Sequence, residues 1–291
     1  MFILEIFMKI LFTSLLTICL LQAHAQTKYK IYDTQAKKII SIGDLTKAIN
    51  KTDVLFFGEE HNDSVAHVLQ DTIYKSLINK YKNVTLSLEM FETDCQNVVN
   101  EYLNDFITET NLINDGRAWG NYRDYRNTVN TAKKFKQQVV AANAPRRYVS
   151  LVNRKGLAEL EKLNPQSKSY FAPLPIDTLN APYYQKFVDL MGGQTHFGGN
   201  KMFHAHSLWD ATMAYNINKS FLQNKNTKIF HLNGRFHSDE KLGIITQINK
   251  MNKSINIKNI SAFAADDFDN PDWSKYLVLG DFVILTQNKK S

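Results

Sequence analysis

Two short motifs place a histidine just beyond a largely apolar run. The runs at 54–57 and 229–232 are each followed by a Gly-x-x-His motif, which ends at His61 in the first case and at His237 in the second. A neutral imidazole can bind a metal ion or transfer a proton near neutral pH. If the runs are strands of one parallel sheet, their carboxyl ends lie at the edge where ligands bind, and we expect the imidazoles to meet there. The alternative is that each histidine only hydrogen-bonds its own loop, since a third match, ending at His196, follows no strand.

Acidic residues accompany the two histidines. Glu60, or its neighbour Glu59, ends the first run, and Glu89 ends the predicted strand 84–90. Two imidazoles and one carboxylate, from His61, His237 and Glu89, suit a divalent metal ion such as zinc, manganese or iron(II). A carboxylate that does not bind the metal could act as general base toward a metal-bound water. These residues predict a metal site and, as one function, a metal-dependent hydrolase (peptidase or esterase) with catalytic residues Glu60, His61, Glu89 and His237.

A second set of residues suits a different ligand. Haem requires an apolar slot, an axial tyrosine, histidine or methionine, and cations for its propionates. The segment 147–218 is rich in methionine and aromatic residues, and Arg146 precedes it. The alternative is that these side chains form the core of their own helices. The residues of this set that we predict to bind haem are Tyr183, Tyr184, His196, His206 and Arg146.

The elements that position these residues alternate between strand and helix. That order predicts an α/β fold with a mainly parallel central sheet flanked by helices and connected by right-handed crossovers. A helical insertion at about 147–218, with helices at 149–163, at 181–191 and through His204–Met213, interrupts the order and should cap the carboxyl ends of the strands. Asp210 in the last of these helices could cap, pair with an arginine or orient a histidine. Residues 26–291 are predicted to form one domain. We expect a hairpin at 29–41, strands at 54–57, 84–90, 138–143, 228–233, 257–262 and 281–286, and helices at 44–49, 65–81, 94–108, 122–137 and 239–251.

Composition excludes some classes of function. The chain has 291 residues, of which 44% are hydrophobic and 22% charged, as in ordinary globular proteins. The net charge of +7 is spread along the sequence, without a basic stripe interleaved with aromatic residues. We therefore expect no nucleic-acid partner. A mildly basic surface suits an anionic ligand or an anionic membrane face.

The N-terminus has the features of a secretory signal peptide. A lysine at position 9, an apolar run to Leu21 and the small-residue end Ala23-His24-Ala25 predict cleavage after residue 25 and a periplasmic location. Acylation at Cys19 is the rival, disfavoured because Ile18 precedes it. After cleavage Cys95 would be the one cysteine left, which excludes an intramolecular disulfide. We expect Cys95 to be a packing residue, with a thiol nucleophile as the alternative.

Taken together, these segments resemble the ChaN-type haem-binding uptake family, which is related to the Tiki and erythromycin-esterase folds. The matching motifs occur in the family's order over about residues 52–286. They are Leu55–His61, Leu88–Phe91, Trp119 with Tyr122 and Tyr125, Asn143–Arg146 with Gly156 and Leu157, Trp209–Ala214, and Asn233–His237.

The resemblance implies an exported protein that binds haem for iron acquisition. It also implies tyrosine ligation, a homodimer with haem at its interface, and membrane-associated uptake components as partners. The Tiki relatives imply instead a metal-dependent peptidase that uses His61, His237 and Glu89, with Glu60 beside them. The chain departs from the family pattern at His206, where glutamine is expected, and at Arg235-Phe236, where small residues are expected. Whether the protein is an enzyme, a binding protein or an inactive scaffold stays open from the sequence.

Overall fold

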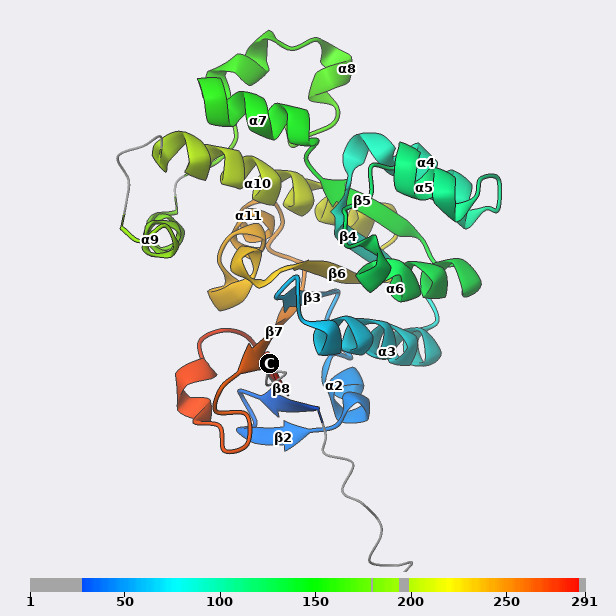
Figure 1. The fold of residues 1–291 in the computed structure, drawn as a ribbon, viewed down its shortest axis with the longest axis vertical. Helices are drawn as coiled ribbons and strands as arrows, with labels where there is room; N and C mark the ends of the chain where they lie inside the picture. Colours follow the sequence, from blue (N-terminus) through cyan, green and yellow to red (C-terminus); the bar gives the residue numbers. More distant parts are fainter. Residues whose placement is uncertain (1–27, 179, 194–198, 288–291) are drawn as a thin grey trace, which may run out of the picture.

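The computed structural model describes residues 28–178, 180–193 and 199–287 (Figure 1). The predicted signal peptide, Cys19 and His196 lie outside these residues. Within the described residues, no helix has both the length and the apolar character needed to cross a bilayer.

The described chain contains one sheet of eight strands in the order β2-β1-β8-β7-β3-β6-β4-β5. The six strands from β8 to β5 are parallel, whereas β1 pairs antiparallel with both β8 and β2. The mainly parallel α/β fold is therefore confirmed, and the predicted hairpin extends the sheet at one edge. The strands are β1 (Tyr29–Asp33), β2 (Lys38–Ile40), β3 (Val54–Glu59), β4 (Val84–Glu92), β5 (Val139–Asn143), β6 (Lys228–Gly234), β7 (Ile257–Ala265) and β8 (Phe282–Gln287).

The helices cover both faces of this sheet (Figure 1), and short 3-10 turns lie in several of the connections. The α-helices are α2 (Ile42–Ala48), α3 (Ser64–Tyr81), α4 (Gln96–Leu103), α5 (Glu109–Asp115), α6 (Tyr122–Lys134), α7 (Arg146–Lys155), α8 (Pro165–Lys168), α9 (Ala181–Leu190), α10 (Gly199–Gln223) and α11 (Ile244–Met251). The 3-10 helices are η1 (Thr93–Cys95), η2 (Leu157–Lys162), η3 (Arg235–His237), η4 (Asp239–Lys241) and η5 (Trp273–Tyr276).

Alternate residues of the central strands supply two separate cores. Leu55 and Phe57 of β3 pack with Ile73 of α3 and Val129 of α6 on one face. Val54 and Phe56 face the other way, toward α10 and α11. Because side chains alternate along a strand, β3 is buried on both faces, and its position at the centre of the sheet is fixed by this double burial. Cys95 is buried and belongs to the packing, as expected.

The described residues of the segment 147–218 contain no strand, as predicted, but its helices differ from those expected. The predicted helix 149–163 is interrupted at Gly156, whose φ of +96° ends α7 and starts the 3-10 turn η2. The first half of α10 packs with α7 in a core of the cap, whereas Met213 and Ile217 farther along α10 pack on the sheet. The cap and the sheet are therefore joined by one continuous helix.

Two other predicted helices differ at their boundaries, and one helix was not predicted. The predicted helix 94–108 consists of the turn η1 and of α4, which ends at Leu103. The predicted helix 239–251 begins only at Ile244, because Gly243 has a φ of +55° and Glu240 a φ of +61°, which break the helical path. The segment 109–115 was expected to be a loop. It forms α5, because Thr108 and Asn111 cap each other's backbone in a capping box.

Candidate functional site

The first Gly-x-x-His motif lies at the end of β3, between β7 and β6. Gly58 faces the second motif so closely that a Cβ there would lie 2.8 Å from the Cα of Arg235. The strand continues through Glu59, and His61 turns back so that its Nδ1 lies 2.8 Å from Glu59 Oε1. The side chain of His61 is 44% exposed. One nitrogen of this imidazole is thus held by a buried carboxylate, and Nε2 remains for other partners.

Polar side chains from α3 and α6 surround the buried Glu59. The Tyr125 hydroxyl donates a hydrogen bond of 2.6 Å to Oε1, and the Gln70 amide donates to Oε2. His67 Nε2 lies 3.3 Å from Oε2. Burial by itself would raise the pKa of Glu59, but the neighbouring His61, His67 and Tyr125 outweigh it and lower the pKa to about 2. The hydrogen bond to this carboxylate raises the pKa of His61.

The second motif lies at the end of β6, with His237 in the turn η3. Its Nδ1 lies 2.6 Å from Asp210 Oδ1 of α10. Its Nε2 lies 3.6 Å from Glu89 Oε1 at the end of β4. Burial lowers the pKa of His237, and burial raises the pKa of Asp210 to about 7. Asp210 therefore orients a histidine, one of three roles that the sequence allowed.

The two motifs meet around Glu89. The Gly234 N–H donates a hydrogen bond of 2.6 Å to Glu89 Oε2. A Cβ on Gly234 would lie 2.9 Å from His61 Nε2 and 3.7 Å from Glu89 Oε2. The structure thus brings His61, Glu89 and His237 together at one edge of the sheet, as expected from their placement after parallel strands. Their chemical roles remain predictions.

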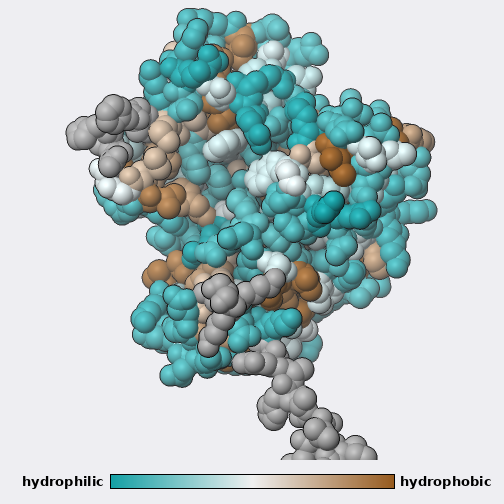
Figure 2. Space-filling model, in the orientation of Figure 1, coloured by the Kyte–Doolittle hydropathy of each residue, from teal (hydrophilic) through white to brown (hydrophobic). Residues whose placement is uncertain are grey.

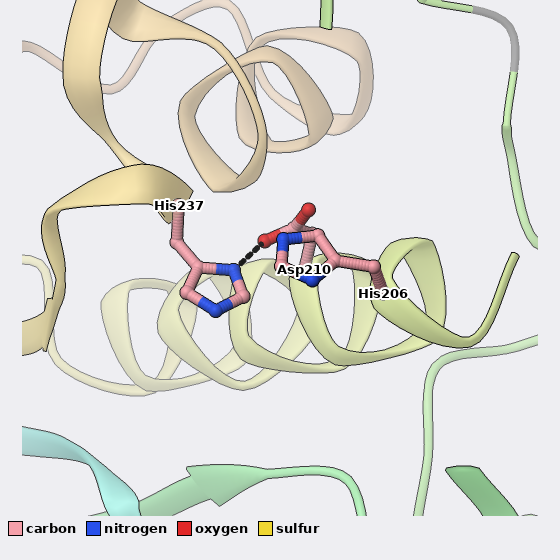
Figure 3. A group of neighbouring side chains, drawn as sticks. All are labelled: His206, Asp210 and His237. Atoms are coloured by element: carbon pink, nitrogen blue, oxygen red, sulfur yellow. Dashed lines mark hydrogen bonds and ion pairs between the residues drawn. The ribbon is translucent and has the colours of Figure 1, made fainter. Parts of the chain in front are cut away.

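His206 adds a third imidazole from the cap (Figure 3). Its ring stacks on that of His237 with 4.3 Å between centroids and an interplanar angle of 3°. His206 Nε2 lies 2.8 Å from the hydroxyl of Tyr183. Burial, followed by the neighbouring His237, lowers the pKa of His206 to about 3, so this imidazole is neutral. Burial and then the charge of Asp210 raise the pKa of Tyr183.

A cavity of about 670 Å³ opens between the strand ends and the cap. This volume lies in the range of small-molecule and cofactor sites. Its walls combine aromatic and aliphatic side chains with a few polar groups. The lining residues are His61, Glu89, Glu92, Trp119, Asn143, Ala144, Arg146, Val149, Ser150, Asn153, Phe187, Met202, Ala205, His206, Trp209 and His237.

The predicted haem-binding residues are not all at this cavity. Arg146 and His206 line it. Tyr183 is buried behind His206 and does not line the cavity, and Tyr184 bonds Asn200 at 3.0 Å instead. The aromatic residues of α9 pack with Phe203 into a small core of the cap, which is the alternative stated for them.

The glutamate next to His61 is Glu59. Glu60 does not line the cavity, and its Oε1 lies 3.9 Å from Arg235 on the outside of the motif. The reason is that β3 continues through Glu59, so that Glu59 and Glu60 point to opposite sides. The polar groups of Gln70 in α3 and Tyr125 in α6 are buried and therefore need hydrogen-bond partners. This need could have indicated that Glu59, and not Glu60, is the buried carboxylate. The cavity residue Asn143 was also missed, although it ends the predicted strand 138–143.

Comparison with known proteins identifies the family. The family model described as "Haem-binding uptake, Tiki superfamily, ChaN" matches residues 45–248.

The chain belongs to this ChaN family.

Among solved structures, the ChaN-family chain is similar to one described as "Cofacial heme binding to ChaN of Campylobacter jejuni". The TM-score is 0.70 at 20% sequence identity, over 90% of this chain and 98% of that one. It is also similar to the type III effector HopBA1, with a TM-score of 0.50 at 12% identity, over 86% of this chain and 94% of that one. At these identities both likenesses show the fold alone. No curated protein matches the chain.

Proposed function

We propose that this protein binds haem in the cavity between the strand ends and the cap, and that it is exported and serves iron acquisition. The observation that carries the proposal is that one cavity combines apolar aromatic walls, an imidazole with a free nitrogen and an arginine at its edge. Membership of the haem-binding family supports the choice of ligand. The similar ChaN structure is described as binding haem cofacially. For this chain we propose a homodimer with haem at its interface.

The cavity walls suit a flat, apolar macrocycle. Phe187, Met202, Ala205 and Trp209 come from α9 and α10, and Val149 comes from α7. Trp119 lies on the other side, edge-on to His61 with 5.2 Å between ring centroids. A haem site requires such an apolar slot, which excludes water and holds the ring by dispersion contacts.

His61 is the axial ligand that the geometry favours. Glu59 holds its Nδ1, which leaves the lone pair of Nε2 for a metal, as in carboxylate–histidine–metal arrangements. Its side chain is half-exposed, whereas His237 is buried and Tyr183 lies behind the wall. When bound, haem would supply an iron that this imidazole could hold.

Arg146 is placed to bind the propionates. It is the first residue of α7, it is exposed, and it lies at the edge of the cavity. Its neighbour Arg147 is instead committed to Asp94. A planar guanidinium can hold a carboxylate through two parallel hydrogen bonds.

A hemin titration followed at the Soret band tests the proposal. We expect a saturable shift, which is weakened in His61→Ala and Arg146→Gln. His204→Ala on α10 and Arg154→Gln on α7 are matched controls, because neither residue lines the cavity. A flat titration of the unmodified protein would refute haem binding. If His61→Ala binds with an unchanged spectrum, the assignment of the axial ligand is wrong.

The export proposal rests on the signal-peptide pattern of residues 1–25. The N-terminal sequence of the mature protein and its presence in the periplasmic fraction would test this part separately. The arrangement of His61, Glu89 and His237 also offers groups for metal-dependent hydrolysis, but the family match favours haem. Hydrolysis is therefore not the function that we propose.

A further inference from the structure

Three side chains behind the cavity wall form a compact group of metal-binding atoms. His206, Asp210 and His237 each offer one donor atom, and these atoms all lie within 4.8 Å of one another. Figure 3 shows that all three side chains point toward one another, two from α10 and one from the turn after β6. Among the described residues, no other group of three or more histidine, cysteine, aspartate or glutamate side chains meets this spacing.

The backbone holds these donors in place. His206 and Asp210 are four residues apart on α10, so they lie one above the other on the same face of the helix. Asp210 is only 1% exposed, and His237 is buried. The tight fit of Gly243 against His237 O, 2.5 Å from the place of a Cβ, shows how closely the turn with the third donor is packed. The backbone thus fixes where the three side chains begin, and only their side-chain torsions must change to bind an ion.

One oxygen of Asp210 has no hydrogen bond of good geometry among the described residues, although the Tyr183 hydroxyl interacts with this carboxylate. Oδ1 bonds His237, but Oδ2 is buried without a hydrogen-bond partner in the part of the chain that the structure describes. An unsatisfied buried carboxylate oxygen costs free energy, and a cation is the group that satisfies it best. The rings of His206 and His237 lie parallel beside this carboxylate, so one ring must rotate out of the stack before nitrogens of both can reach a single ion.

We propose that His206, Asp210 and His237 bind a single divalent transition-metal ion, separate from the haem. Two nitrogens and one carboxylate oxygen suit Zn²⁺, Fe²⁺ or Co²⁺. Two ligands of a tetrahedral ion at 2.0–2.1 Å are separated by roughly 3.3 Å. The donors here span 2.6 Å, between His237 and Asp210, to the limit of 4.8 Å, so binding an ion requires side-chain rotations that open the parallel stack of the two imidazoles.

The surroundings fit an ion with an open coordination position. Tyr183 bonds His206 Nε2 and so fixes the ring, as partners of metal-bound histidines do. His206 and His237 line the cavity, whereas Asp210 lies behind them. An ion at this place would therefore enter from the cavity and keep a coordination position facing it.

This group differs from the set of His61, Glu89 and His237, although both contain His237. The donors of that set are not all within 4.8 Å of one another among the described residues. If the ion binds at His206, Asp210 and His237, replacing His206 should abolish metal binding and replacing His61 should not. If it binds at His61, Glu89 and His237, the reverse is expected.

Titration of the untagged, hemin-free protein with Co²⁺ tests the proposal, because a cobalt site of low symmetry has visible absorption bands. We expect saturation at one equivalent. His206→Gln and Asp210→Asn should each weaken the apparent affinity for Co²⁺ by more than about 10-fold. A loss of about 10-fold is the smallest that is typical when a residue that only hydrogen-bonds a metal ligand is removed. His204→Gln, two residues from His206 on the same helix, is the control and should titrate like the unmodified protein.

His61→Ala is the discriminating variant. Retained Co²⁺ binding in His61→Ala, together with loss in His206→Gln, supports the site. Loss in His61→Ala with retention in His206→Gln would overturn it in favour of the ion lying at Glu89. Absence of any cobalt spectrum in the unmodified protein would also overturn it, whatever the hemin titration shows. Circular dichroism of each variant establishes that lost binding is not lost folding.

Discussion

The two Gly-x-x-His motifs share one plan but present different imidazoles. Each follows one of two adjacent parallel strands, and in each a buried carboxylate lies within hydrogen-bond distance of Nδ1. His61 is half-exposed and its pKa is raised, whereas His237 is buried and its pKa is lowered. The difference comes from the carboxylate's source. Glu59 lies within the same motif and leaves His61 open, but Asp210 comes from α10, which covers His237.

The comparison also shows that the motifs depend on each other. Gly58 makes room for the backbone of Arg235 in the second motif, and Gly234 makes room for the ring of His61 in the first. Each glycine is therefore required by the other motif rather than by its own turn. The local sequence determines where the strand and the turn lie. The neighbouring motif leaves no room for a side chain at Gly58 or Gly234.

The largest effect is expected from Gly58→Ala. The new Cβ would lie 2.7 Å from Ser238 Oγ and 2.8 Å from the Arg235 Cα. The backbone at Arg235 cannot move away without disturbing the second motif. We expect the free energy of unfolding to fall by about 3 kcal/mol, the upper end for overpacking. Urea denaturation measures it. Gly120→Ala is the control, because a Cβ there meets nothing within 4 Å. Equal stability of the two variants would show that the motifs do not interlock.

Next in size is Glu59→Gln, with Glu60→Gln as the matched control. Glu59 is buried with several polar partners, so its replacement should lower the free energy of unfolding at neutral pH by about 2 kcal/mol. The Glu60 side chain is 40% exposed, so Glu60→Gln should change the free energy of unfolding by less than about 0.5 kcal/mol.

The effect of Glu59→Gln should depend on pH. Because the pKa of Glu59 is lowered from 4.5 to about 2 on folding, its contribution is present above pH 4.5 and is lost as pH falls toward 2. The gap between the unmodified protein and this variant should close over that interval. A gap that is constant down to pH 2 would contradict an ionised Glu59.

Gly234→Ala should affect binding more than stability. Its Cβ would meet the tip of His61 at 2.9 Å, and the end of an exposed side chain can move away. We expect a loss of unfolding free energy below about 1 kcal/mol. The hemin titration should shift to higher concentrations, because His61 is displaced. Unchanged hemin binding would show that the position of His61 is not decisive.

The smallest effect is the separation of the two histidine titrations. In NMR spectra of the ring nitrogens, His61 should titrate above its usual value of 6.5 and His237 below it. The stabilisation from His61 is present below pH 6.5 and is lost as pH rises through its folded pKa. For His237 the dependence of stability on pH has the opposite sign, because protonation of the buried ring opposes folding. Glutamine variants assign the signals, and a common midpoint near 6.5 would contradict the contrast.

The sequence predicted the sheet well, because the apolar runs of a parallel sheet are long and bounded by clear turns. It also placed His61, Glu89 and His237 at one edge, since that follows from strand ends alone. It did not distinguish Glu59 from Glu60, because β3 is buried on both faces and shows no alternation of polarity near its end.

Features that depend on tertiary packing were harder to predict. Tyr183 and Tyr184 have the composition of a haem ligand but lie in or beside a core of the cap, which only the path of α9 reveals. The pairing of Asp210 with His237 joins residues from different elements, and three roles were open for Asp210. Only its spacing of four residues from His206 on one helix was visible in the sequence.

The continuity of α10 limits how a ligand can come and go. One straight element of 25 residues, roughly 37 Å long, carries His206 near its start and the sheet-packing residues Ile217 and Phe221 near its end. Its cavity-lining turn therefore cannot swing outward without pulling apolar side chains out of the sheet core. A ligand should therefore enter and leave through the open side of the cavity, where His61 and Arg146 are exposed, without movement of α10.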